Sequence, residues 1–154
     1  MTRARVFRRI LHPTDFSRAS GAALDRALRL VEQNGAELLL VHVLAPTPPM
    51  VGEGFVSPGT YEVLEASARR EAQKRLSALV ARAQKRTARV KGLLLHGLPH
   101  DQVARAARSR GADLIVMGTH GRTGLSRLFL GSVAGRVVQL APCPVLTVRG
   151  GQGR

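Results

Sequence analysis

A glycine and hydroxyl motif in the last third of the chain has the composition of an anion-binding loop. The pattern G-x2-G-x9-G-S begins at Gly118, directly after the apolar run 114–117, and ends at Ser132. Glycine lets backbone N–H groups approach phosphate oxygens because no Cβ stands in the way, and hydroxyl groups add further hydrogen bonds. The motif lies between the end of an expected strand and the start of an expected helix. It therefore predicts a cradle for nucleotide phosphates.

Three further motifs accompany this loop in a fixed order. They are HPTDFS at 12–17, VHV at 41–43 and PCPVL at 142–146. Neither the G-x4-G-K-[ST] loop nor the G-x-G-x-x-G fingerprint of common nucleotide sites occurs in the chain. The four motifs together make residues 5–149 resemble the universal stress protein family, specifically its ATP-binding branch.

The resemblance implies that ATP binds where strand ends meet, with Mg²⁺ held mainly by the phosphates. Val43 and Met117 would flank the adenine, Asp15 would accept hydrogen bonds from the ribose, and the amides of Gly121 and of 131–133 would face the phosphates. No side chain is expected to act as a catalyst or as a direct metal ligand. The expected binding residues are Pro13, Thr14, Asp15, Val43, Met117, Gly118, Thr119, His120, Gly121, Arg122, Arg127, Gly131, Ser132 and Val133.

Each of these residues also has a simpler explanation. Asp15 could cap the helix that begins near Ser17, and the glycines could serve only as turns. Arg122 and Arg127 could clamp a phosphate in two-point geometry or remain solvated, and Arg136 lies close enough in sequence to add charge. The histidines at or near strand ends are more often packed or hydrogen-bonded than catalytic.

Rapid hydrolysis is not expected from this loop. No Asp, Glu or Gln occurs between Gly118 and Val138, so the loop offers no side chain to orient or deprotonate an attacking water. Slow turnover is the most that these residues predict.

The charge of the chain leaves a second class of partner open. Lys and Arg number 24 against 10 acidic residues, a formal net charge of +14, which favours polyanions. An arginine-biased proteome would give the same balance. Nucleic acid is possible but not favoured, because one Tyr, four Phe and no Trp leave few aromatic surfaces for stacking bases.

The elements that must position the motifs alternate along the chain. Five short apolar runs predict strands at 6–11, 38–44, 90–95, 114–117 and 145–148. Amphipathic stretches between them predict helices at 17–33, 60–86, 99–110 and 132–140. This alternation predicts a single-domain α/β fold, Rossmann-like or adenine nucleotide alpha hydrolase-like, with a five-stranded parallel sheet covered by helices on both faces.

The rest of the chain is expected to be simple. Residues 1–150 form the domain, 151–154 a loose tail, and 45–59, rich in proline and glycine, a surface loop. Ser17 is expected to cap the first helix, and Gly35 to end it. No apolar run reaches the 18 residues of a membrane-spanning helix, and the lone Cys143 suits a reducing compartment, so a cytoplasmic protein without membrane contact is expected.

The last strand is expected at a sheet edge, where unpaired backbone groups invite a partner. In the family that the chain resembles, this strand pairs with its twin, which implies a homodimer through residues 143–149. The function implied is that of a nucleotide-dependent stress-response sensor, or a module that binds an unknown protein partner. The alternatives are a slow ATPase or nucleotide-transfer enzyme at the same site, and a basic adaptor for nucleic acid or acidic partners.

Overall fold

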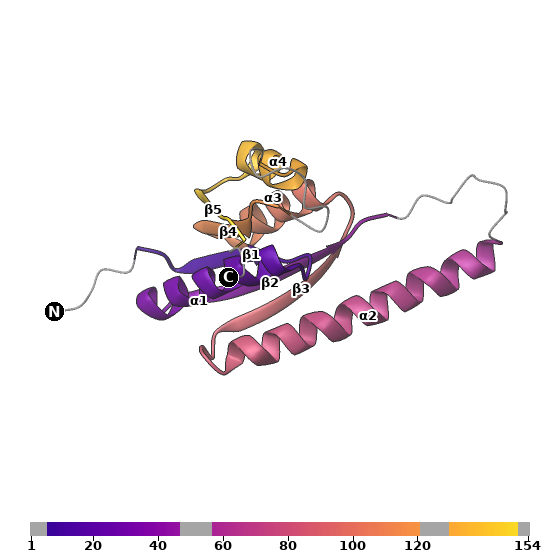
Figure 1. The fold of residues 1–154 in the computed structure, drawn as a ribbon, viewed down its shortest axis with the longest axis horizontal. Helices are drawn as coiled ribbons and strands as arrows, with labels where there is room; N and C mark the ends of the chain where they lie inside the picture. The colour runs from indigo at the N-terminus through magenta and orange to yellow at the C-terminus, as the bar shows by residue number, and fades with distance from the viewer. Residues whose placement is uncertain (1–5, 47–56, 121–129, 151–154) are drawn as a thin grey trace.

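The computed structural model describes residues 6–46, 57–120 and 130–150, in which strands and helices alternate (Figure 1). The elements are β1 (Arg9–Pro13), α1 (Arg18–Asn34), β2 (Glu37–Leu44), α2 (Pro58–Gln84), β3 (Val90–His96), α3 (Pro99–Arg110), β4 (Leu114–Gly118), α4 (Ser132–Leu140) and β5 (Val145–Val148). The tail expected at 151–154, and residues 47–56 of the expected loop, lie outside the described residues.

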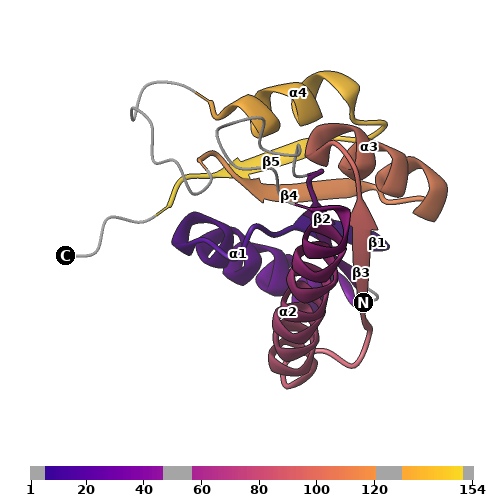
Figure 2. The same cartoon turned by 90° about the vertical axis from the view of Figure 1, so that its right-hand side faces the viewer.

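The five strands form one parallel sheet in the order β3-β2-β1-β4-β5. Helices α1 and α2 cover one face, where Leu24, Leu28 and Leu76 join one apolar core. Helices α3 and α4 cover the other face, where Val103 and Val137 join a second core (Figure 2). The predicted α/β fold is confirmed, and so is the position of the last strand at a sheet edge.

The first strand begins later than the sequence indicates. The apolar pattern predicted 6–11, whereas β1 is Arg9–Pro13. The amides of residues 6 and 7 donate to Oδ1 of Asn34, and those of residues 8 and 9 donate to the carboxylate of Asp113. Side chains from other parts of the chain thus satisfy these backbone groups, and the ladder with β2 starts only at residue 9.

The ends of α1 follow local sequence signals. The Ser17 hydroxyl accepts a hydrogen bond from the amide of Ser20 at 3.2 Å, and Gly35 ends the helix in a left-handed conformation with φ of 59°. Both expected caps are confirmed, and each supplies what a helix end lacks.

Helix α2 begins two residues before the position expected from the sequence. Pro58 and Gly59 were assigned to the loop at 45–59, but both belong to the helix. The Ser57 hydroxyl accepts from the amide of Thr60 at 3.3 Å, and the fixed φ of proline suits the first turn of a helix. Proline therefore marks a helix start here rather than a continuation of the loop.

Only the C-terminal half of α2 packs closely on the sheet. Its buried residues are Ala72, Leu76 and Ala83, and its N-terminal half projects past the strands (Figure 1).

Among the described residues, no helix is both long enough and apolar enough to cross a membrane.

The connections diverge between β1 and β4, which are neighbours in the sheet. The chain leaves β1 toward α1 on one face and leaves β4 toward α4 on the other face. Such divergence opens a crevice beyond the carboxyl ends of parallel strands, where ligands bind in open α/β sheets.

Candidate functional site

A pocket of about 330 Å³ occupies this crevice. Its volume falls within the range of roughly 300–1,000 Å³ that is typical of small-molecule sites. The chain supplies its lining from the ends of β1, β2 and β4 and from the first turns of α1, α3 and α4. The lining residues are Pro13, Thr14, Asp15, Ser20, Val41, His42, Val43, Pro99, Val103, Met117, Gly118, Thr119, His120, Gly131, Ser132, Val133 and Ala134.

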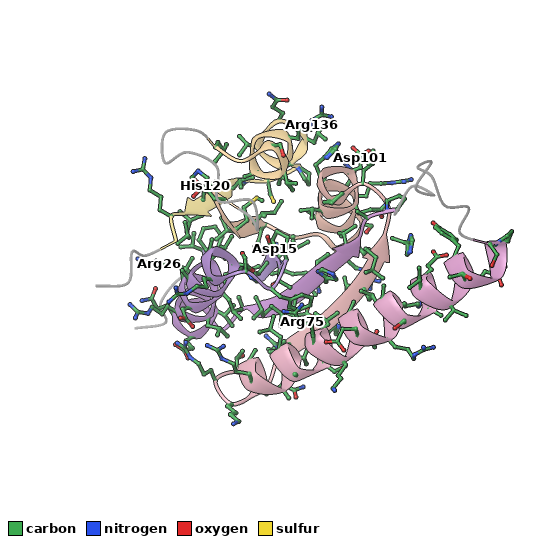
Figure 3. The ribbon with its side chains drawn as sticks, turned by 45° about the vertical axis from the view of Figure 1, so that its right-hand side comes forward. Asp15, Arg26, Arg75, Asp101, His120 and Arg136 are labelled. Carbon is green, nitrogen blue, oxygen red and sulfur yellow. The ribbon has the colours of Figure 1, made fainter. Side chains whose placement is uncertain are left out.

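Eleven of the residues expected from the sequence line this single pocket. They are Pro13, Thr14, Asp15, Val43, Met117, Gly118, Thr119, His120, Gly131, Ser132 and Val133. The other three, Gly121, Arg122 and Arg127, lie outside the described residues. Arg136 is exposed on α4 and does not line the pocket, whereas Asp15 lies near the centre of the molecule where α1 begins (Figure 3).

The turn that follows β1 is held by hydrogen bonds on both sides. The Thr14 amide donates to the carbonyl of Val41 at 2.8 Å, and Nδ1 of His42 donates to the carbonyl of Thr14 at 2.7 Å. Asp15 Oδ1 accepts from the amide of Ser17 at 2.9 Å. Asp15 is therefore not the cap of α1, which is Ser17, although its carboxylate does stabilise the turn that leads into the helix. A carboxylate has several acceptor positions, so the same side chain can also serve a ligand.

Phe16 lies in this turn with a left-handed backbone, φ 63°, and no other non-glycine residue among those described has a positive φ. That conformation is strained for an aromatic residue and persists only where the surroundings fix it. Here the ring packs against His42 with centroids 4.5 Å apart, and the guanidinium of Arg75 lies 4.5 Å from the ring centroid. Contacts from β2 and α2 thus hold the turn that presents Asp15.

A buried polar chain lies directly beneath the turn. His12 is fully buried, and its Nδ1 donates to the carbonyl of Val116 at 2.8 Å. Because Nδ1 carries the proton, Nε2 is the acceptor that faces the Ser20 hydroxyl at 3.3 Å. That hydroxyl also lies 2.8 Å from Oγ1 of Thr14. These hydrogen-bonded side chains connect the centre of the sheet to Thr14, which lines the pocket.

Burial lowers the pKa of His12 from 6.5 to about 4, although the Val116 carbonyl and the nearby Asp15 charge both favour the protonated form. His12 is therefore neutral near pH 7 and serves as a packed, hydrogen-bonded group, as expected for a histidine at a strand end.

The first turn of α4 lines the pocket. Gly131 precedes this helix and offers no side-chain cap, and the first turn contains no acidic residue. An uncapped helix N-terminus carries partial positive charge and N–H donors, which suit an anion. Within the described residues, no group of three His, Cys, Asp or Glu side chains could hold a metal ion.

Two glycines of the pocket also allow close packing of the backbone, which the sequence did not indicate. A Cβ on Gly118 would lie 3.2 Å from the backbone carbonyl of Ala19, and a Cβ on Gly131 would lie 2.8 Å from the carbonyl oxygen of Thr119. The Gly131 amide, which was expected to face the phosphates, instead donates to that same oxygen at 2.7 Å. These glycines allow backbone segments to approach each other, so a side chain added there would first strain the fold.

We therefore expect Gly118→Ala to destabilise the protein by about 1 kcal/mol, since an added methyl would crowd the α1 backbone. The matched variant Gly21→Ala adds a methyl near the start of α1 with no atom within 4 Å, and we expect it to stabilise by about 0.5–1 kcal/mol. Urea denaturation of both variants measures the difference. Equal stabilisation by the two substitutions would contradict the close packing of β4 on α1.

Six lining residues were not identified from the sequence: Ser20, Val41, His42, Pro99, Val103 and Ala134. Val41 and His42 directly precede Val43 in the VHV motif, so the motif itself could have indicated them. Pro99 and Val103 lie in the first part of α3, the helix that follows β3. No local signal in the sequence shows that this helix reaches the crevice.

Comparisons with known proteins agree with this arrangement. The profile of the Universal stress protein family matches residues 7–149. Universal stress protein MJ0531 of Methanocaldococcus jannaschii is 34% identical over 144 residues, covering 94% of this chain and 83% of that protein. The Thermus aquaticus universal stress protein of the QAH/OAS sulfhydrylase 3′ region is 38% identical over 144 residues, covering 94% of this chain and all of that protein.

A solved structure, that of MJ0577, superposes with a TM-score of 0.75 at 27% identity, covering 95% of this chain and 98% of that one. The family profile spans nearly the whole chain, and the two relatives align over 83% and 100% of their own length. The chain belongs to the universal stress protein family.

Proposed function

We propose that the pocket binds an adenine nucleotide, with ATP as the main ligand and Mg²⁺ held mainly by its phosphates. One observation carries the proposal: the uncapped start of α4, the Asp15 carboxylate and the apolar side chains of Val43 and Met117 line the same cavity. Each of these three features suits one part of a nucleotide.

The phosphates suit the α4 end of the pocket. The first hydrogen bond of α4 is donated by the amide of Gly135 to the carbonyl of Gly131. The amides of 132–134 come before it and have no acceptor within the helix. Such amides and the helix dipole attract an anion, and the Ser132 hydroxyl adds a donor. His120 also lines this part of the cavity.

The nucleoside suits the opposite end. Val43 on β2 and Met117 on β4 lie on either side of β1, and both line the cavity with apolar side chains, which suit an adenine. Asp15 would accept hydrogen bonds from the ribose hydroxyls, in the turn that Phe16 and His42 hold.

Universal stress proteins of this fold have been solved in complex with cAMP and, from Archaeoglobus fulgidus, in complex with dAMP. They are 22% and 24% identical to this chain, with TM-scores of 0.64 and 0.63. These likenesses concern the fold, so the pocket residues of this chain carry the proposal.

Titration calorimetry of nucleotide-free protein with ATP, ADP and AMP, each with and without Mg²⁺, tests the ligand class. We expect affinity to fall from ATP to ADP to AMP, because each lost phosphate removes an interaction with the start of α4. The affinity for inorganic triphosphate, compared with that for ATP, shows how much of the binding free energy the nucleoside contributes. Binding of triphosphate as tight as that of ATP would overturn the nucleoside end of the proposal, and absence of heat with all three nucleotides would overturn the whole.

The bound nucleotide would act chiefly as a signal rather than as a substrate. The stretch from Gly118 to Val138 contains no Asp, Glu or Gln, so it has no side chain suited to orient an attacking water. We propose a nucleotide-dependent module of the stress response, with slow hydrolysis at most. Steady phosphate release that is lost in Asp15→Ala would instead favour an enzyme.

We also propose a homodimer through residues 143–149. Among the described residues β5 pairs only with β4, and Leu146 is 38% exposed at this edge of the sheet. Two copies would bury this apolar edge against each other across a two-fold axis. Sedimentation velocity is expected to give twice the monomer mass for the wild type and the monomer mass for Leu146→Lys. A wild-type monomer at all concentrations would contradict this.

A further inference from the structure

The strand at the opposite edge of the sheet, β3, has backbone groups available for pairing. Within the described residues it pairs only with β2. The Arg89 carbonyl and the Gly97 amide both bond toward β2. Because successive residues of a strand direct their backbone groups to alternate sides, the amides and carbonyls of 90, 92, 94 and 96 point away from the sheet.

A groove of about 460 Å³ runs beside this edge, between β3 and α3. Its floor includes the half-buried side chains of Leu93 and Leu95. Helix α3 packs mainly over the inner strands, through Val103 and Ala107 in the core shared with β1 and β2. The outermost strand is therefore only partly covered on this face (Figure 2).

The wall of the groove is positively charged. Arg105, Arg108 and Arg110 line it from α3, and all three are exposed. No ion pair joins them to a carboxylate among the described residues. By contrast, Lys91 on the same face of β3 is paired with Glu37 at 2.8 Å. The groove thus combines an apolar floor, an unpaired strand edge and three basic side chains with no acidic partner there.

We infer that this groove is a docking surface for an acidic segment of another protein, bound in extended form along β3. The segment would pair its backbone with the strand edge, cover Leu93 and Leu95 with aliphatic side chains, and bring carboxylates to the arginines of α3. Backbone pairing supplies affinity and side chains on alternate faces supply specificity in such strand addition.

A peptide fits these features better than nucleic acid or a second copy of the chain does. A strand edge offers hydrogen bonds in the register of another backbone, and an apolar floor gives nothing to a phosphate backbone. A second copy would bring the same three arginines and a formal net charge of +14 against each other. The groove shares no lining residue with the nucleotide pocket, so this inference does not depend on the proposed function.

The probe is a fluorescein-labelled peptide as long as β3, seven residues, in which pairs of glutamates alternate with pairs of valines. Each face of such a strand carries both kinds of side chain, whatever its register. We expect saturable binding to the full-length protein in fluorescence anisotropy. The double substitution Arg105→Glu with Arg108→Glu is expected to weaken it about tenfold or more, because attraction becomes repulsion.

The matched control is Arg69→Glu with Arg70→Glu, which reverses two exposed charges on α2 and is expected to leave binding unchanged. Thermal melting of both double variants checks that they fold. A peptide of the same sequence with every backbone amide N-methylated keeps its charge but has no N–H donor along either edge, and is expected to lose most of its affinity.

Three results would overturn the inference. An equal loss of peptide affinity in both double variants would show that the peptide is attracted only by the net charge of the protein. Undiminished binding of the N-methylated peptide would remove the role of the strand edge. Tighter binding of a duplex DNA oligonucleotide than of the peptide, with the same loss in Arg105→Glu and Arg108→Glu, would assign the arginines to a phosphate backbone.

Discussion

Replacing Ser132 by glutamate is expected to weaken ATP binding about 30-fold without lowering the stability of the fold. Ser132 is the first residue of α4 and lines the pocket. Two unit charges near a protein surface interact by about 4 kcal/mol at 4 Å, and solvent at this exposed position would reduce that by about half. A negative charge in the first turn favours the helix itself. The substitution therefore disfavours ATP binding but does not disfavour folding, so a loss of affinity can be told apart from a loss of stability.

The matched control is Gln139→Glu, which adds the same charge to the far, exposed end of α4. Its affinity for ATP is expected to equal that of the wild type in calorimetry. Ser132→Ala removes only the hydroxyl and is expected to lose a few-fold. If Ser132→Glu bound ATP as tightly as the wild type, the phosphates would lie elsewhere than at the start of α4.

The stability of the protein is expected to fall by about 3 kcal/mol between pH 6.5 and pH 4 because of His12 alone. Burial lowers the pKa of His12 in the folded state to about 4, whereas the unfolded chain binds the proton near pH 6.5. In this window the unfolded state holds more protons, so its free energy falls relative to that of the folded state as the pH decreases. The contribution is complete above pH 6.5 and is lost by pH 4.

His12→Asn isolates this effect, since the asparagine Nδ2 can donate to the Val116 carbonyl in place of Nδ1 but does not titrate in this range. Urea denaturation of both proteins from pH 4 to pH 7.5 gives two curves whose difference cancels the carboxylates they share. We expect the wild-type curve to be steeper. Parallel curves for the wild type and His12→Asn would mean that His12 is not buried as neutral imidazole.

Local patterns in the sequence predicted the elements well because each element carries its own signal. The strands are apolar runs, Ser17 and Gly35 cap α1, and Pro99 opens α3. Two predicted boundaries were wrong, the first because distant residues decided the outcome and the second because a local helix-start signal was assigned to a loop. Asn34 and Asp113 occupy the amides before β1, and Ser57 makes Pro58 the start of α2 instead of part of a loop.

The candidate site was likewise predictable from the sequence only in part. The motifs identified which residues meet beyond the strand ends, because parallel strands bring their carboxyl ends to one edge of the sheet. They did not reveal that Gly118 packs against Ala19, nor that Phe16 adopts a left-handed backbone against His42. Those contacts join segments far apart in the chain, and only the packing of α1 and β2 on the sheet determines them.

The most direct test of the nucleotide site is a titration of ¹⁵N-labelled protein with ATP, followed through its backbone amide signals. We expect saturable shifts centred on the amides of Thr14, Val43, Gly118 and Ser132, which line the pocket from four separate elements and turns. Shifts confined to another surface, such as the groove between β3 and α3, or no shift at saturating ATP, would contradict a nucleotide site in this crevice.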